Sequence, residues 1–233
     1  MHHIDIPAHV IEQVLRRRGR LEIFDRLDPA RTALLVIDMQ NCFLDPDYSI
    51  VTVPGLRDIV ANINRLAAVC RAAGVTVVWT QHQYTEGWRS WFEHFATPDV
   101  SARIIEQTKP GAYGFDLAPV MAVDSDDWRV VKTRSSPFTP GSSDLDQRLR
   151  SAGLDTLIIS GTLTNVCCEC AARDAMLLNY STLFAADGTG ARTDAEHNAT
   201  LVNMLQFFAD VRTCDELAAL VAADGETSRR PTP

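Results

Sequence analysis

The stretch Thr156-Leu-Ile-Ile-Ser160-Gly-Thr-Leu-Thr-Asn-Val-Cys167 joins a short apolar run to a glycine-containing turn and a cysteine. The residues that follow, Cys168 to Asn179, have the apolar spacing of a helix. A buried strand that turns directly into a helix is the repeating unit of a parallel α/β sheet. This stretch therefore predicts an α/β fold and places a thiol at a strand-to-helix turn.

The same alternation of short apolar runs and helical segments extends along the chain in both directions. The predicted strands are Ala33–Asp38, Val75–Thr80, Arg129–Lys132, Thr156–Ser160 and Thr182–Asp187, with a weaker sixth run at Ala209–Arg212. The predicted helices are Leu56–Ala73, Asp144–Ala152, Cys168–Asn179 and Ala195–Phe208. Because the strands are apolar throughout, we expect both faces to be covered. This predicts a three-layer α-β-α arrangement with a mainly parallel sheet and Rossmann-type winding.

The length of 233 residues suits one sizeable core. We expect an N-terminal arm over residues 1–29, one domain over residues 30–222 and a flexible tail over residues 223–233. Residues 81–109 interrupt the strand and helix alternation with several aromatic side chains. We interpret them as an excursion over one edge of the sheet.

Composition excludes several kinds of partner. The formal net charge is -8, with 22 Lys and Arg against 30 Asp and Glu, so no nucleic-acid partner is expected. No apolar run approaches the roughly 18 residues of a membrane span, so no membrane partner is expected either. The N-terminal sequence lacks the pattern of a secretory signal, which favours a cytoplasmic location and reduced cysteines.

Three reactive side chains are predicted at the carboxyl ends of strands, where ligands collect in such sheets. Asp38 ends the first run, Lys132 ends the third, and Cys167 follows the fourth. A thiol near a helix N-terminus favours the thiolate. Cys167 can then act as nucleophile, Asp38 as its base, and Lys132 as the cation that stabilises both charges. Each residue also has an ordinary structural interpretation, as a loop cap, a solvated charge or a packed thiol.

Three segments carry a resemblance to the isochorismatase-like cysteine hydrolases, which include nicotinamidases, N-carbamoylsarcosine amidases, ureidoacrylate amidohydrolases and biuret hydrolases. The segments are Leu34-Leu-Val-Ile-Asp38-Met-Gln40-Asn-Cys-Phe43, Val130-Val-Lys132-Thr-Arg134-Ser-Ser-Pro-Phe138, and Ser160-Gly-Thr-Leu-Thr-Asn-Val-Cys167-Cys-Glu-Cys-Ala-Ala-Arg173-Asp174-Ala.

The resemblance implies a six-stranded parallel sheet and maps a catalytic trio onto Asp38, Lys132 and Cys167. It also implies a cis peptide at Thr162-Leu163, with the backbone N–H groups of Leu163 and Cys167 as the oxyanion hole. The implied reaction is hydrolysis of a C–N bond in a small amide or ureide through a thioester, with release of ammonia or an amine.

Departures from the family pattern narrow this implication. The Asp-x-His metal motif of nicotinamidases is missing, because the region reads Trp79-Thr-Gln81-His82-Gln83-Tyr84, so no metal or other cofactor is expected. Isochorismatases that cleave a vinyl ether usually lack the nucleophilic cysteine, so Cys167 favours C–N hydrolysis. The alternatives are a vinyl-ether hydrolase that uses Asp38 without covalent catalysis and a non-catalytic binding protein on the same fold.

Further residues are predicted to contact the substrate, and the family resemblance implies a homodimer or homotetramer. Arg134 is equally suited to a substrate carboxylate or to an internal ion pair. Cys168 is expected to be packed rather than nucleophilic, and Cys42, Cys70 and Cys214 are expected in the interior. The predicted substrate contacts are Gln40, Phe43, Trp88, Trp91, Arg134 and Asn165.

Overall fold

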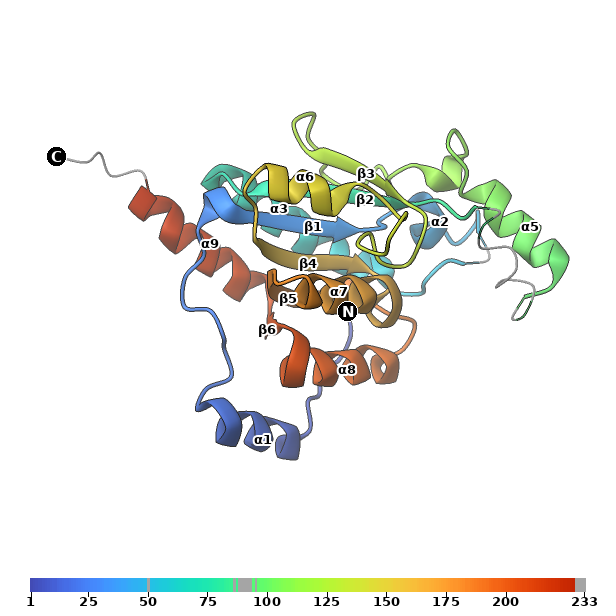
Figure 1. Cartoon of the computed structure of the whole chain (residues 1–233). Helices are drawn as coiled ribbons and strands as arrows, with labels where there is room; N and C mark the ends of the chain where they lie inside the picture. The colour runs from blue at the N-terminus through green and yellow to red at the C-terminus, as the bar shows by residue number, and fades with distance from the viewer. Residues whose placement is uncertain (50, 86, 88–93, 95, 229–233) are drawn as a thin grey trace.

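Six strands form one sheet in the order β3-β2-β1-β4-β5-β6, and all five neighbouring pairs are parallel. Figure 1 shows the computed structural model, which describes residues 1–49, 51–85, 87, 94 and 96–228. The strands are β1 (Thr32–Ile37), β2 (Thr76–His82), β3 (Trp128–Lys132), β4 (Thr156–Thr162), β5 (Ser181–Gly190) and β6 (Asp210–Arg212).

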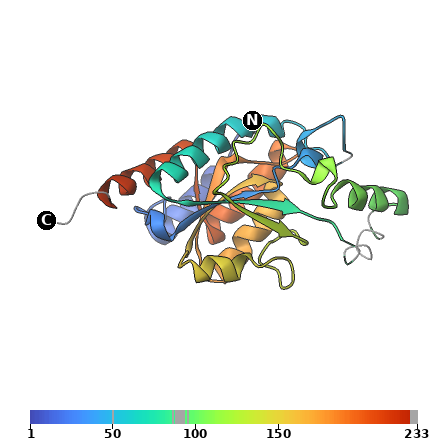
Figure 2. The ribbon, with the colours of Figure 1, turned by 90° about the horizontal axis from the view of Figure 1, so that it is seen from above.

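Helices cover both faces of the sheet. Successive residues of each strand point to opposite faces, so each strand packs against both helix layers. Leu34 and Val36 of β1 belong to the cluster with α3 and α9, whereas Leu35 belongs to the cluster with α6, α7 and α8. Figure 2 shows α3 and α9 along one face and α6 on the other. The α-helices are α1 (Ala8–Arg18), α2 (Asn41–Leu44), α3 (Val60–Ala73), α5 (Pro98–Gln107), α6 (Leu145–Ser151), α7 (Glu169–Leu177), α8 (Asp194–Asn203) and α9 (Cys214–Ser228).

Shorter helical turns extend several of these elements. The 3-10 turns are Pro29–Arg31, Leu56–Ile59 and Tyr113–Phe115, and the π-helical turns are Thr164–Cys168 and Met204–Phe208. Thr164–Cys168 leads directly into α7, so this helical segment starts four residues earlier than predicted. We call Thr164–Cys168 the cysteine turn.

The predicted three-layer fold is confirmed, and the six strands lie where the apolar runs predicted them. Sequence reasoning did not predict α5 or α9. Helix α9 continues to Ser228, into the segment predicted to be a flexible tail, and the flexibility of that segment stays a prediction. None of the described helices is long and apolar enough to cross a membrane.

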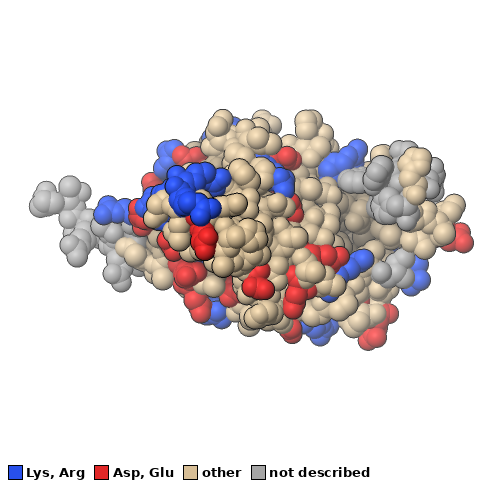
Figure 3. All heavy atoms as spheres, turned by 90° about the horizontal axis from the view of Figure 1, so that it is seen from below, with Lys and Arg blue, Asp and Glu red and all other residues tan. Residues whose placement is uncertain are grey.

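The N-terminal segment packs on the same chain. Val10 and Val14 of α1 form a small buried cluster with Leu205. The return path to the sheet is fixed because the Asp210 carboxylate accepts the backbone N–H groups of Ile23 and Phe24. The last turn of α1 is rich in arginine, and basic side chains gather at one end of the lower face of the molecule (Figure 3).

β1 and β4 are neighbours in the middle of the sheet. From β1 the chain continues through β2 to β3 at one edge, and from β4 it continues through β5 to β6 at the other edge, so the strand order reverses between β1 and β4. Gly161 lies at this point, with φ +108, directly beside Ile37. A Cβ atom on Gly161 would lie 2.1 Å from the Ile37 carbonyl oxygen. Only glycine therefore lets the ends of β1 and β4 approach this closely, and these ends carry Asp38 and the cysteine turn.

We predict that Gly161→Ala lowers the free energy of unfolding by about 2 to 4 kcal/mol, because it combines a left-handed backbone with a steric clash. Gly153→Ala is the matched control, since Gly153 also has positive φ (+73) but has no atom within 4 Å of the added Cβ. Gly153→Ala should cost about 1 kcal/mol. Urea unfolding of both variants measures the difference, and equal losses would contradict the steric argument.

Candidate active site

Asp38 is the first residue after β1, and its backbone has φ 53, a left-handed conformation that Asp tolerates better than most side chains. Its carboxylate is fully buried. The Thr80 hydroxyl donates to Oδ1 of Asp38 at 2.7 Å, and the Asp38 N–H donates to the Thr80 carbonyl oxygen at 3.2 Å. The end of β2 thus fixes both the backbone and the side chain of Asp38.

Lys132 is the last residue of β3, and its ammonium group is fully buried. Nζ lies 2.7 Å from Asp38 Oδ2, 2.9 Å from His82 Nδ1, 3.1 Å from the Arg134 carbonyl oxygen and 3.5 Å from Cys167 Sγ. An ammonium group has three protons for these four acceptors, so the longest contact, to sulfur, is the weakest. Burial disfavours the charge, but Asp38 and Cys167 outweigh it and raise the pKa of Lys132.

Cys167 lies in the cysteine turn, and the whole residue is only 6% exposed. The peptide bond Thr162-Leu163 before this turn is cis, as the family resemblance implied. The Leu163 carbonyl oxygen accepts the N–H groups of Val166 and Cys168, both at 3.1 Å. Burial raises the pKa of the Cys167 thiol to about 12, although the Lys132 ammonium lowers it. The sequence favoured a thiolate at this helix start, but in the buried site the thiol form is favoured.

His82 is a member of this cluster that sequence reasoning did not assign to it. One side-chain atom of each of Asp38, His82 and Cys167 lies within 4.8 Å of the others. Thr80 and His82 are two residues apart on β2, and side chains at this spacing share one face of a strand, which is the signal that could have found them. Burial, followed by the charges of Lys132 and Arg134, lowers the pKa of His82, so the imidazole is neutral.

Asp38, His82 and Cys167 carry atoms that could ligate a metal ion, but the ammonium group of Lys132 already lies beside all three of them. Its Nζ is bonded to His82 Nδ1 and Asp38 Oδ2 and lies 3.5 Å from the Cys167 sulfur. Since an ammonium donates protons and accepts none, His82 Nδ1 must be the unprotonated nitrogen. The cluster therefore fits an internal cation better than a bound one.

Comparison with known proteins identifies the family of this chain. The family model described as the isochorismatase domain matches residues 32–216. The chain belongs to the isochorismatase-like cysteine hydrolase family. It is 32% identical over 224 residues to a ureidoacrylate amidohydrolase RutB of Methylobacterium radiotolerans, covering 88% of this chain and 84% of that protein.

Other relatives show the range of this isochorismatase-like family. A probable inactive nicotinamidase of Arabidopsis thaliana is 33% identical, covering 74% of this chain and 87% of its own. The crystal structure of a cysteine hydrolase from Pseudomonas syringae pv. phaseolicola superposes with a TM-score of 0.78 at 28% identity, covering 88% and 98% of the two chains. Membership alone does not guarantee activity, so the chemistry must be argued from the site.

Two of the predicted substrate contacts have clear structural surroundings. The Gln40 amide donates to the His82 and Phe115 carbonyl oxygens and accepts the His82 N–H, so it ties the chain after β1 to the end of β2. Phe43 is 5% exposed and belongs to the hydrophobic core. Contact of Gln40 and Phe43 with the substrate stays a prediction. Trp88 and Trp91 lie outside the described residues.

Asn165 has a different environment from Gln40 and Phe43. It lies in the cysteine turn, and its Oδ1 is buried without a hydrogen-bond partner in the described part of the chain. A buried acceptor of this kind is suited to an N–H donor that the protein itself does not supply.

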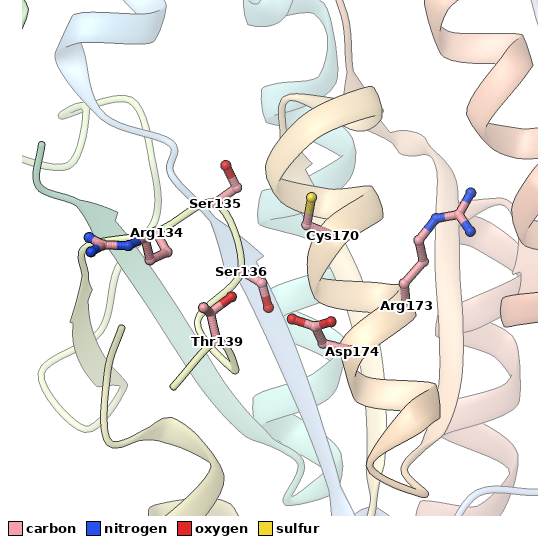
Figure 4. Close-up of a pocket in the computed structure, with 7 residues that line it drawn as sticks. All are labelled: Arg134, Ser135, Ser136, Thr139, Cys170, Arg173 and Asp174. Atoms are coloured by element: carbon pink, nitrogen blue, oxygen red, sulfur yellow. The ribbon is translucent and has the colours of Figure 1, made fainter. Parts of the chain in front are cut away.

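Arg134 lies beside a surface groove of about 370 Å³ between the loop after β3 and helix α7 (Figure 4). Its Nη1 donates to the neighbouring Thr133 carbonyl oxygen at 2.8 Å, and its guanidinium group points away from α7. Ser136 and Thr139 point across the groove toward Asp174. The backbone of Arg134 contributes directly to the cluster, since its carbonyl oxygen accepts from Lys132.

The remaining cysteines are distinct from Cys167. Cys168 is fully buried and its sulfur faces the Ser160 carbonyl oxygen at 3.8 Å. Cys42, Cys70 and Cys214 are buried as predicted. Cys170 is partly buried at the surface groove, so it is the thiol with which Cys167 must be compared in labelling experiments.

The raised pKa of Cys167 predicts how its alkylation depends on pH. Below a pKa of about 12 the thiolate fraction, and with it the alkylation rate, should rise about tenfold per pH unit between pH 7 and 9. Iodoacetamide labelling followed by mass spectrometry measures this rate, in a Cys170→Ser background that removes the competing thiol. A rate that is already constant at pH 7 would show a preformed thiolate and contradict the prediction.

Proposed function

We propose that this chain is a cysteine amidohydrolase that cleaves a C–N bond in a small amide or N-carbamoyl compound, releasing ammonia or an amine. The observation that carries the proposal is the buried ammonium of Lys132, bonded to Asp38 and within 3.5 Å of the Cys167 sulfur. The name of the Methylobacterium relative, a ureidoacrylate amidohydrolase, supports an N-carbamoyl substrate.

In the proposed first step Asp38 accepts the Cys167 proton. The thiol is otherwise too weak an acid to ionise at neutral pH, because burial raises its pKa to about 12. As the proton leaves, Lys132 can strengthen its contact with sulfur and stabilise the thiolate. Neutral His82 accepts a hydrogen bond from Lys132, which holds the ammonium group between the two reacting residues.

The thiolate then attacks the carbonyl carbon, and the tetrahedral oxyanion is bound by the backbone N–H groups of Leu163 and Cys167. Asp38 returns its proton to the leaving nitrogen and the thioester forms. Water, activated by Asp38, hydrolyses this thioester and restores the thiol. In this proposal Asn165 Oδ1 accepts an N–H of the substrate, while Arg134 and the aromatic residues Trp88 and Trp91 remain predicted substrate contacts.

Removing the nucleophile should abolish turnover. We expect Cys167→Ala to lower kcat at least about a thousandfold, whereas Cys170→Ala, three residues away, should keep wild-type activity. Ammonia release is measured across ureidoacrylate, biuret, triuret, carbamoylsarcosine, nicotinamide and maleamate, first with the wild-type chain to find an accepted substrate. Wild-type turnover by Cys167→Ala on that substrate would exclude covalent catalysis.

A trapped intermediate separates the amidohydrolase from a vinyl-ether hydrolase. Rapid acid quench during turnover of the accepted amide should give a mass increase equal to the acyl group on the peptide that contains Cys167. A vinyl-ether hydrolase that works through Asp38 alone forms no such adduct. Isochorismate cleavage with no acyl adduct would favour that alternative.

Asp38→Asn tests the base. It should lower kcat on the accepted amide by about a hundredfold or more, because the thiol loses the group that takes its proton during attack. Thr80→Val is the control that loosens the carboxylate without removing it, since Thr80 donates to Asp38 Oδ1, and its effect should be smaller. Undiminished kcat in Asp38→Asn would rule out Asp38 as the base.

A further inference from the structure

A pair of stacked histidines lies behind the cysteine turn. His197 of α8 is fully buried, and its Nδ1 lies 3.0 Å from the hydroxyl of Thr164, the first residue of the cysteine turn. The His2 ring stacks on His197 with centroids 4.4 Å apart and an angle of 19° between the planes. Residues from the start of the chain therefore reach the turn that holds Cys167 through one intermediate side chain.

His2 is fixed on two sides. Its Nε2 accepts the Ala191 N–H at 2.9 Å, and its Nδ1 lies 2.8 Å from Asp194 Oδ1. Because a backbone N–H can only donate, Nε2 must be unprotonated, and Nδ1 then carries the proton and donates to Asp194. These two bonds fix the plane of the His2 ring, which is the surface on which His197 packs.

The chain at Gly190 and Ala191 supports Thr162, the residue before the cis peptide bond to Leu163. The Thr162 hydroxyl donates to the Gly190 carbonyl oxygen at 3.3 Å, and the next residue is Ala191, which His2 holds. Thr162 and Thr164 flank Leu163, whose N–H is assigned above to the oxyanion. His2 thus contacts both supports of Leu163: one through Ala191 and one through His197.

The arm is also anchored independently of His2. The Asn198 amide accepts the Asp5 N–H and donates to the His3 carbonyl oxygen, both at 2.9 Å. Loss of the His2 ring therefore leaves the arm attached to α8 and removes the stacking surface together with the bonds to Ala191 and Asp194. This separates the role of the ring from the role of the arm as a whole.

We propose that His2 and His197 are positioning residues that hold Thr164, and through it Leu163 and Cys167, in the geometry required for attack and oxyanion binding. This inference rests on the proposed function, since it requires Cys167 to be the nucleophile. Neither histidine contacts the reacting atoms. Misplacement of a reacting group by about 1 Å can cost about a hundredfold in rate, so a support of this kind acts on kcat.

The first test removes the Thr164 hydroxyl. Thr164→Val should lower kcat about ten- to hundredfold with less than about a twofold change in KM, whereas Thr164→Ser, which keeps the hydroxyl, should retain most activity. In the arm, His2→Ala should lower kcat about three- to tenfold, and the neighbouring exposed His3→Ala is the matched control. Wild-type kcat in both Thr164→Val and His2→Ala would overturn the inference.

A double-mutant cycle distinguishes positioning from general loss of stability. If His2 acts mainly through Thr164, the loss of kcat in the double variant His2→Ala/Thr164→Val should be smaller than the product of the two single losses. Losses that multiply would show independent effects and overturn the inference. Cys167→Ala is included in the same assay: if it retains turnover, the proposed function fails, whereas an inactive Cys167→Ala with fully active Thr164→Val and His2→Ala sinks only the present inference.

Discussion

The buried ammonium of Lys132 is the constraint on which the arrangement of the site depends. A charge without solvent must be surrounded by acceptors, and removing one partner of a buried ion pair typically costs about 3 to 5 kcal/mol. Its acceptors come from the ends of different strands: the Asp38 carboxylate after β1, the His82 imidazole on β2 and the sulfur of Cys167 after β4. This one cation therefore joins the carboxyl ends of the strands, and it also brings the Cys167 thiol beside the Asp38 carboxylate.

Much of this arrangement can be predicted from sequence, because strands and strand ends leave strong local signals. Asp38 and Lys132 lie at or just after the ends of apolar runs, and parallel strands bring their carboxyl ends to one edge. The role of His82 requires knowledge of which side of the sheet its side chain lies on and how β2 is paired with β1 and β3, and this register depends on distant parts of the chain. The local sequence pattern did not predict helix α5 or the interaction of His2 with Asp194 either, since both depend on contacts between distant parts of the chain.

The state of the thiol shows two physical effects acting in opposite directions. A position near the start of a helix and beside an ammonium favours the thiolate, whereas complete burial favours the neutral thiol. Burial is the larger effect and raises the pKa of Cys167 to about 12. Sequence reveals the helix and the lysine but not the depth of the site, which is why the thiolate was expected there. A protected thiol is also less exposed to unwanted alkylation and oxidation until a base removes its proton.

The docking of the N-terminal arm has a consequence for the order of events during synthesis. Asp5 and His2 are synthesised long before their partners Asn198 and Asp194, and α1 is synthesised long before Leu205, on which it packs. At about 5 to 20 residues per second, the ribosome needs about 10 to 40 s to supply these partners. Throughout this interval the apolar face of α1 has no place to bind on its own chain. The arm is therefore translated long before it can reach its native position.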